Sequence, residues 1–298
     1  MALPSELYDI LEGRLGTTIR HATAIGGGMV NKAAKVVTVD GPVFVKWKPD
    51  AAPGMFESEA EGLERLRAAG ALRVPEIVSV GDVADDPSVE LPYLALEWIQ
   101  PEEPHRPRKF AENFAAGLAL LHRKSVSPDC AFGLERDNFL GRRAQSNKWT
   151  TDWPAFYRDQ RLLPMVALAQ SKGRLNPERE RLLHKVIDNI DRWLLSGEPA
   201  CLVHGDLWSG NFLTVGETAA IVDPAVYYAD REVEIAYVQL FGGFPPGFVD
   251  LYSSHYPLDK GYLERRPLLQ LYPLLVHLIS FGESYGPNVD AVCRRYIE

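Results

Sequence analysis

The first hundred residues alternate hydrophobic and polar positions with the period of two that is typical of β-strands. Five runs have this pattern: residues 18–25, 31–39, 42–48, 75–83 and 93–99. Asp40-Gly41 stands between the second and third runs, and this pair favours a two-residue hairpin turn. In the third run the alternation places Lys46 on the face opposite to Val45 and Trp47. The N-terminal third is therefore predicted to contain an antiparallel sheet.

Two stretches of the same region have the 3.6-residue period of a helix, residues 4–14 and 55–69. The second has an apolar stripe that includes Leu63 and Leu66, and Glu59 falls inside this stripe. A carboxylate in that position needs a partner, because an unpaired buried charge is expensive. Glu59 is therefore a candidate for an ion pair, and a pair with Lys46 would account for both residues; a half-exposed place at the edge of the stripe is the alternative.

The character of the chain changes after a proline-rich stretch that contains Pro101, Pro104 and Pro107. Helical periodicity then dominates, at residues 108–123, 177–195 and around 268–282, while residues 201–225 read as two short strands with loops. This division predicts an α+β, bilobal chain. An N-lobe at 1–99 has an antiparallel sheet with one inserted helix, and a C-lobe at 100–298 is mainly helical.

Composition excludes several classes of protein. The 298 residues are 46% hydrophobic and 24% charged, which is ordinary for a globular chain, and the net charge of −8 with no basic run argues against nucleic-acid binding. No apolar run is long enough to span a membrane, and the N-terminus lacks the features of a signal peptide. The three cysteines are scattered, which argues against a disulfide framework or a zinc site and favours a cytoplasmic protein.

The stretch HGDLWSGN at residues 204–211 is the strongest chemical signal. It places Asp206 and Asn211 five residues apart, and Asp223 follows seventeen residues after Asp206. Protein kinases have the same spacing in their catalytic loop, followed by a metal-binding aspartate, although Gly205 stands here in place of an arginine. There the first aspartate accepts the proton of the attacking hydroxyl, and the asparagine and second aspartate hold Mg²⁺. The alternative is an ordinary turn, since Gly, Asp and Asn all favour turns.

Further parts of a kinase precede this stretch in the expected order. Glycine-rich loops let backbone N–H groups approach phosphates, strand lysines pair with phosphate oxygens, and the end of the last N-lobe strand offers backbone groups to adenine. The corresponding candidates for nucleotide binding are Gly26, Gly27, Gly28, Asn31, Lys46, Glu59, Glu97 and Ile99. Each has a plain alternative, such as a simple turn for the glycines or a solvated strand lysine for Lys46. Their combined order and spacing favour ATP and Mg²⁺ as cofactors.

The chain resembles the fructosamine kinase, or ketosamine 3-kinase, family. The resemblance rests on LVHGDLWSGN followed by DPAVYYADRE, on residues 132–162 with FG, DN, DW and RL at the family's spacing, and on LYPLLVHLISFGESYG at 271–286. It covers nearly the whole chain. That family belongs to the protein-kinase-like fold shared with aminoglycoside and choline phosphotransferases, and HGDxxxxN alone is common to the wider group.

The resemblance implies ATP-dependent phosphorylation of the 3-hydroxyl of ketosamines, the products of a sugar and an amine. The 3-phosphate then breaks down and releases the amine, so the protein would deglycate small molecules and glycated proteins. Asp206 would be the base, and Asn211 and Asp223 would hold Mg²⁺. Trp208 and His277 are candidates for the sugar pocket, with packing roles as the alternatives. A monomer or weak dimer is expected.

The chain departs from the family pattern at Ala229, Glu234, Pro273 and Val276. Some relatives also have a cysteine in the glycine loop, whereas this chain has Met29 nearby and no cysteine there. None of these positions belongs to the catalytic set, so they bear on substrate preference rather than on activity. Two rival readings remain. One is another small-molecule kinase of the same fold, for an aminoglycoside, choline or homoserine, and the other is a non-catalytic nucleotide-binding module.

Overall fold

The computed structural model describes residues 3–26, 31–82, 91–194 and 199–297. The chain forms two compact units that are interleaved along the sequence. Unit 1 contains residues 1–121, 138–144 and 210–225, and unit 2 contains residues 122–137, 145–209 and 226–298. The division into lobes at 99/100 stays a prediction, because each of these units takes segments from several parts of the chain.

Unit 1 is built on a five-stranded sheet in the order β1-β2-β3-β5-β4, in which all neighbours are antiparallel. Its strands are β1 (Ile19–Ile25), β2 (Lys32–Thr38), β3 (Pro42–Trp47), β4 (Ile77–Gly81) and β5 (Tyr93–Glu97). All five predicted strands are thus present, and a turn at Asp40-Gly41 joins β2 to β3.

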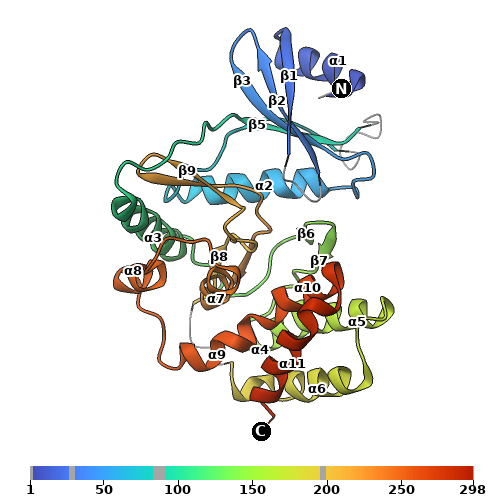
Figure 1. Cartoon of the computed structure of the whole chain (residues 1–298), viewed down its shortest axis with the longest axis vertical. Coiled ribbons are helices and arrows are strands. Elements are labelled where there is room, and N and C mark those ends of the chain that lie inside the picture. The colour runs from blue at the N-terminus through green and yellow to red at the C-terminus, as the bar shows by residue number, and fades with distance from the viewer. Residues whose placement is uncertain (1–2, 27–30, 83–90, 195–198, 298) are drawn as a thin grey trace. The chain divides into compact units, whose positions relative to one another are not determined.

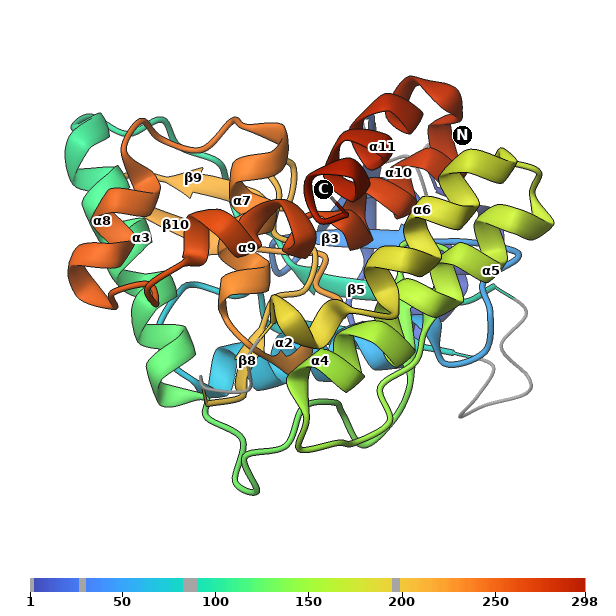
Figure 2. The ribbon, with the colours of Figure 1, turned by 90° about the horizontal axis from the view of Figure 1, so that it is seen from below.

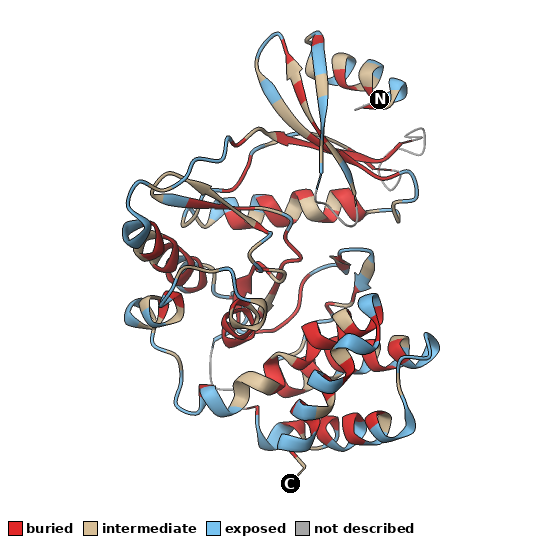
Figure 3. Cartoon of the chain, in the orientation of Figure 1, coloured by how far each residue is buried: buried red, intermediate tan, exposed pale blue. Residues whose placement is uncertain are grey.

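Helices lie against both faces of this sheet (Figure 1). Leu7 and Leu11 of α1 (Ser5–Leu15) belong to one buried cluster with Val45 and Trp47 of β3. The buried side chains of α2 (Met55–Ala68), among them Leu63, pack towards β4 and β5. Figure 3 shows this pattern as buried residues along the sheet and along one side of α2. Because both faces are covered, even the polar Lys46 of β3 is buried, with 3% of its surface exposed.

The rest of unit 1 joins the sheet to the stretch that contains Asn211 and Asp223. It includes α3 (Pro107–Lys124) as far as Leu121, β6 (Asn138–Leu140), and a hairpin of β9 (Phe212–Val215) and β10 (Thr218–Ile221). The Phe212 ring packs on Phe114 of α3 at a centroid distance of 4.9 Å. The backbone N–H of Ile221 also donates to the carbonyl of Arg73 at 2.9 Å. The hairpin is therefore fixed to the N-terminal part of the chain.

Unit 2 is mainly helical, with one short strand pairing. Its main helices are α4 (Trp153–Phe156), α5 (Leu163–Ser171), α6 (Pro177–Ile187), α7 (Glu232–Phe241), α8 (Phe248–His255), α9 (Tyr262–Leu269), α10 (Leu271–Phe281) and α11 (Gly286–Arg295). The strands β8 (Cys201–Val203) and β11 (Tyr227–Ala229) pair with each other in this unit. In unit 1, β6 pairs with β7 (Arg143–Gln145), which begins in that unit. Figure 2 shows α10 and α11 beside α5 and α6, in agreement with their contacts. None of the helices in the described residues is long and apolar enough to cross a membrane.

Three predicted elements differ from the structure. The helix expected at 177–195 ends at Ile187, and a short 3₁₀ turn at Ile190–Arg192 follows. Asp188 and Asn189 favour turns over helix interiors because their side chains compete for backbone hydrogen bonds. Ile190 is nevertheless buried, so the apolar pattern of the sequence extends beyond the end of the α-helix. Residue 195 lies outside the described residues. Residues 201–225 hold three strands rather than two, because Gly216 has a φ of +57° and closes the β9–β10 hairpin.

The helix predicted at 268–282 is divided into α9 and α10 at Gln270. Pro273 has no N–H to donate to the carbonyl of Leu269, so a continuous helix would leave that oxygen unpaired. The hydroxyl of Tyr157, in the π-helical turn Tyr157–Leu162, donates to the Leu269 carbonyl at 2.8 Å. A side chain from a distant part of the sequence thus satisfies the broken turn.

Candidate active site

The β9–β10 hairpin brings Asn211 and Asp223 together at its open end. Phe212 pairs with Ile221, and the backbone N–H of Val222 donates to the carbonyl of Asn211 at 3.0 Å. The side-chain amide of Asn211 donates to the backbone carbonyl of Asp223 at 3.4 Å. Antiparallel pairing therefore makes neighbours of two residues that are twelve positions apart in the chain.

Lys46 lies between two carboxylates within unit 1. Its ammonium group contacts Glu59 of α2 and donates to Oδ1 of Asp223 at 2.7 Å. The predicted pair between Lys46 and Glu59 is thus present in the structure, and Asp223 adds a second partner. Burial opposes the charge of the lysine, but the two carboxylates outweigh it and raise the pKa of Lys46 above its ordinary value. Lys46 therefore keeps its positive charge at physiological pH.

Asp223 differs from Glu59 in exposure and in backbone conformation. The side chain of Asp223 is 51% exposed, whereas that of Glu59 is 13% exposed. Asp223 has a φ of +57°, which non-glycine residues rarely adopt and which costs free energy unless the surroundings impose it. This turn directs an accessible carboxylate next to a buried cation. Such a group is suited to exchange the lysine for another cation.

The structure gives less support for the remaining candidates for nucleotide binding. Gly27 and Gly28 lie outside the described residues, and Gly26 is exposed at the end of β1. Asn31 has a buried Oδ1 with no hydrogen-bond partner among the described residues, which leaves an acceptor for a ligand. Glu97 uses its carboxylate to bind Arg73 at 2.6 Å. Ile99 is buried, so only the backbones of Glu97 and Ile99 remain as candidates for adenine contacts.

The first half of the HGDLWSGN motif belongs to unit 2, and the division falls between Ser209 and Gly210. Gly205 follows β8 with a φ of +82°, and its N–H donates to Oε1 of Glu234 on α7 at 2.9 Å. Oε2 of Glu234 contacts Nε2 of His122 at 2.9 Å, and all three groups are largely buried. The backbone next to Asp206 is therefore held by a carboxylate–histidine pair in the core.

The carboxylate of Asp206 has a neutral partner. The hydroxyl of Tyr237, on α7, donates to Oδ1 of Asp206 at 2.7 Å. The backbone N–H of Asp206 donates to Nδ1 of His204 at 3.3 Å. The aspartate is thus oriented by a phenol and by its own loop.

Trp208 and His277 occupy different surroundings in unit 2. The Trp208 side chain is 38% exposed and makes no ring contact with another described residue, so packing beneath the loop does not account for it. His277 lies among Phe241, Phe281 and Tyr285, at ring-centroid distances of 4.3, 5.4 and 5.0 Å. Its Nδ1 lies 2.8 Å from the carbonyl of Pro273. That contact requires a proton on Nδ1, so a neutral His277 presents Nε2 as an acceptor.

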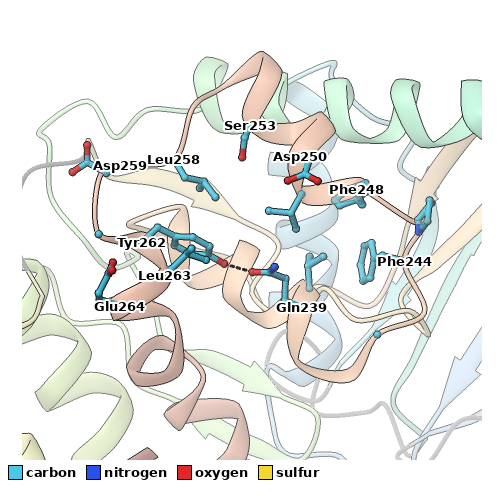
Figure 4. Close-up of a pocket in the computed structure, with 16 residues that line it drawn as sticks. Gln239, Phe244, Phe248, Asp250, Ser253, Leu258, Asp259, Tyr262, Leu263 and Glu264 are labelled. Carbon is cyan, nitrogen blue, oxygen red and sulfur yellow. Dashed lines mark hydrogen bonds between the residues drawn. The ribbon is translucent and has the colours of Figure 1, made fainter. Parts of the chain in front are cut away.

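A pocket of about 710 Å³ lies between α7, α8 and α9, and it contains none of the residues predicted from the sequence (Figure 4). Asp250, Asp259 and Glu264 line it, together with Gln239, whose side-chain oxygen accepts a hydrogen bond from the hydroxyl of Tyr262. The pocket has carboxylates but no lysine or arginine in its lining, so it is unsuited to a triphosphate.

The residues of unit 1 fit a magnesium–nucleotide complex better than a metal bound by protein alone. Asn211 and Asp223 offer oxygen ligands of the kind that Mg²⁺ prefers, and Mg²⁺ commonly takes one or two protein ligands with phosphates and waters. Within the described ranges, no group of three or more His, Cys, Asp or Glu side chains forms a metal cage. A nucleotide would therefore have to complete the coordination.

Two contacts of the candidate site were not predicted from the sequence. Tyr237 has the apolar spacing of a core residue on α7, and nothing in the sequence links it to Asp206, which precedes it by 31 positions. Glu234 was noted only as a departure from the family pattern, although it holds the backbone of Gly205. A carboxylate in an apolar helix was the available signal, as it was for Glu59.

Comparisons with known proteins agree on one family. A family model described as fructosamine kinase matches residues 6–298. A probable ketoamine kinase of Enterococcus faecium is 39% identical over 275 residues, which cover 91% of this chain and 93% of that protein. The chloroplastic protein-ribulosamine 3-kinase of Arabidopsis thaliana is 31% identical over 303 residues, with 99% of this chain and 87% of that protein covered.

Solved structures agree with this result. A crystal structure from Thermobifida fusca, of a protein described as a fructosamine-3-kinase candidate, has a TM-score of 0.87 and 32% identity, and the match covers 99% of each chain. Aminoglycoside phosphotransferase APH(4)-Ia has a TM-score of 0.68 with 17% identity over 99% of each chain, a likeness that shows the fold alone. The predicted fold class, α+β and protein-kinase-like, is thus confirmed.

Proposed function

The chain belongs to the fructosamine kinase family and is a kinase of the ketosamine-phosphorylating type, and we propose that it transfers the γ-phosphoryl group of ATP to the 3-hydroxyl of small ketosamines. The main support for the proposed nucleotide site is the contact of Lys46 with both Glu59 and Asp223. A buried lysine with one buried and one accessible carboxylate is the arrangement that phosphate binding in kinases uses.

Each residue has a distinct role in this proposal. Lys46 binds phosphate oxygens, and Glu59 holds the ammonium group in place. Asn211 and Asp223 hold Mg²⁺, which when bound neutralises negative charge on the phosphates. The Asp223 carboxylate contacts Lys46 and is half exposed, so it would be accessible to the metal. Asn31 and the backbones of Glu97 and Ile99 contribute to nucleotide binding.

Asp206 orients the acceptor hydroxyl and accepts its proton as the phosphoryl group is transferred. Its loop supports this role, because backbone and side-chain hydrogen bonds fix both Gly205 and Asp206. The exposed indole of Trp208 offers a flat apolar face to the C–H groups of a sugar ring. His277 is the second side chain proposed for the sugar pocket, and its Nδ1 lies 2.8 Å from the Pro273 carbonyl. A sugar that contacts these side chains leaves its amine free to vary.

The phosphorylated product favours release of the amine for a chemical reason. Phosphate is a far better leaving group than hydroxide when a carbonyl lies next to it. A ketosamine 3-phosphate therefore loses phosphate and then its amine. We propose that this step removes sugars from free amino acids and from lysines of glycated proteins. The cytoplasm is the predicted location and a monomer or weak dimer the predicted state.

The experiment is a direct test of substrates. Ribulose-lysine, erythrulose-lysine and fructose-lysine are incubated with the protein, Mg²⁺ and ATP, and ADP and 3-phosphates are measured. Choline, homoserine and kanamycin are run alongside. We expect the five- and four-carbon ketosamines to be used better than fructose-lysine. Phosphorylation of choline, homoserine or kanamycin without consumption of any ketosamine would reject the proposal.

A further inference from the structure

We propose that Tyr237 is a positioning residue for phosphoryl transfer, whose hydroxyl holds the carboxylate of Asp206 in a fixed orientation. The inference rests on the proposed role of Asp206 as the base. It is carried by the hydrogen bond from the Tyr237 hydroxyl to Oδ1 of Asp206, with an oxygen–oxygen distance of 2.7 Å.

The position of Tyr237 makes this contact a fixed one. Tyr237 lies on α7, one turn before Phe241, and the two rings meet edge to face at a centroid distance of 5.8 Å and an angle of 72°. Phe241 in turn packs on His277 of α10. A phenol held by its helix and by a neighbouring ring loses little entropy when it donates a hydrogen bond. The carboxylate of Asp206 is therefore held from a rigid part of unit 2.

The phenol remains a donor throughout the working pH range. Burial, followed by the negative charge of Asp206, raises the pKa of Tyr237 well above its ordinary value. A protonated phenol next to a carboxylate forms a charge-assisted hydrogen bond, which is stronger than one between neutral groups. The phenol of Tyr237 thus keeps its proton and donates it in a hydrogen bond to Oδ1 of Asp206.

Both neutral and charged groups surround this pair. Tyr227 of β11 and Tyr272 of α10 lie close enough to add to the raised pKa of Tyr237. His204 receives the backbone N–H of Asp206, and Glu234 receives that of Gly205. The guanidinium of Arg161 lies over the ring of Tyr227, 3.9 Å from its centroid. The Tyr237 hydroxyl therefore adds a neutral donor that orients the Asp206 carboxylate.

A fixed oxygen has two consequences for a base. A carboxylate that is already oriented loses less freedom on reaching the transition state, so kcat rises while substrate binding is unchanged. A hydrogen bond to the charged form also lowers the pKa of the carboxyl, so the base stays ionised at lower pH. Tyr237 would therefore increase kcat and extend activity towards acid.

The experiment compares Tyr237→Phe with Tyr262→Phe. Both substitutions remove one hydroxyl. The hydroxyl of Tyr262 on α9 donates to the side-chain oxygen of Gln239 on α7, two positions after Tyr237 (Figure 4). We expect Tyr237→Phe to lower kcat about tenfold, as loss of one hydrogen bond to a charged group does, with KM for ATP and for ribulose-lysine unchanged. The acidic limb of the pH profile should move up by about one pH unit, the size of shift that one hydrogen bond to a charged group gives. Tyr262→Phe should leave both measurements unchanged.

Other outcomes overturn the inference. A Tyr237→Phe protein that melts normally and retains the wild-type kcat and pH profile would make Tyr237 a packing residue. A rise in KM for ribulose-lysine with normal kcat would make it a substrate contact instead. If Tyr237→Phe does not fold, 3-fluorotyrosine at position 237 serves, because its more acidic phenol should move the acidic limb to lower pH, and no movement rejects the idea. A wild-type protein that phosphorylates no ketosamine would instead reject the proposed function.

Discussion

Two regions of the molecule treat an ionised side chain in opposite ways. In unit 1, Lys46 is buried and is balanced by the charges of Glu59 and Asp223. In unit 2, Asp206 accepts a hydrogen bond from the neutral hydroxyl of Tyr237, whose ring meets Phe241, and Phe241 packs on His277. Lys46 is thus balanced by opposite charges, whereas Asp206 accepts a hydrogen bond from a neutral donor.

The difference matches what each region is proposed to bind. A triphosphate with Mg²⁺ brings large charges of both signs, and a cluster of paired charges can accept them by exchanging partners. A sugar brings hydroxyl groups and apolar C–H faces, which suit aromatic rings and directed hydrogen bonds. We therefore expect substitutions in the charged cluster to act on nucleotide-dependent steps. Substitutions around Asp206 should act on the acceptor.

The largest effect is expected from Asp206→Asn. Loss of the base and of its orienting charge should lower kcat about 10²- to 10⁴-fold, while the affinity for ATP changes little. Steady-state kinetics and calorimetric titration of ATP measure the two quantities. Asp250→Asn, an exposed carboxylate in the pocket of Figure 4, is the matched control and should be fully active. A variant at position 206 with near wild-type kcat would remove it from the role of base.

A smaller loss, about 10²-fold in kcat/KM for ATP, is expected from Lys46→Ala, because one positioned donor to a developing charge has about this effect. The affinity for ketosamine should hardly change. Lys48→Ala is the control two residues along the same chain segment, where the lysine pairs with Asp50, an exposed partner. Equal losses in both variants would mean that β3 was damaged rather than that a phosphate contact was removed.

Glu59→Ala should lower kcat/KM for ATP less than Lys46→Ala does. It removes the side chain that holds Lys46 in place but leaves the contact of Lys46 with phosphate. A double-mutant cycle on kcat/KM should show a coupling of about 0.5–3 kcal/mol between the two positions. The same cycle on Lys48 and Asp50 should show a weaker coupling, because Asp50 is 80% exposed and solvent weakens such pairs. Additive effects of Lys46 and Glu59 would show that their contact has no part in nucleotide binding.

The smallest effect is expected from Trp208→Leu. Loss of an aromatic contact of about 0.5–1.5 kcal/mol corresponds to a rise of about two- to tenfold in KM for ribulose-lysine, with KM for ATP unchanged. Trp193→Leu is the matched control, since Trp193 is similarly exposed at 39% and packs on Tyr296. An unchanged KM for ketosamine at Trp208→Leu would assign the sugar face to another side chain.

Much of this molecule followed from the sequence because the relevant signals are local. Alternation located the five strands of the sheet, and the intrusion of Glu59 into an apolar stripe predicted its contact with Lys46, which the structure confirms. The spacing of HGDLWSGN identified Asp206 and Asn211 as candidates. In each case the period of one element determines which face a side chain occupies, and an out-of-place charge on a buried face requires a partner.

The tertiary structure decided the contacts between distant segments. It added Asp223 to Lys46 across 177 positions and brought Tyr237 to Asp206 across 31. It also ended a predicted helix at Ile187 and divided another at Gln270, where Tyr157 satisfies the carbonyl that Pro273 leaves unpaired. A tyrosine at a core position has the same local pattern whether its hydroxyl meets a backbone carbonyl or a catalytic carboxylate. Only the packing of whole elements determines which acceptor lies within hydrogen-bonding distance.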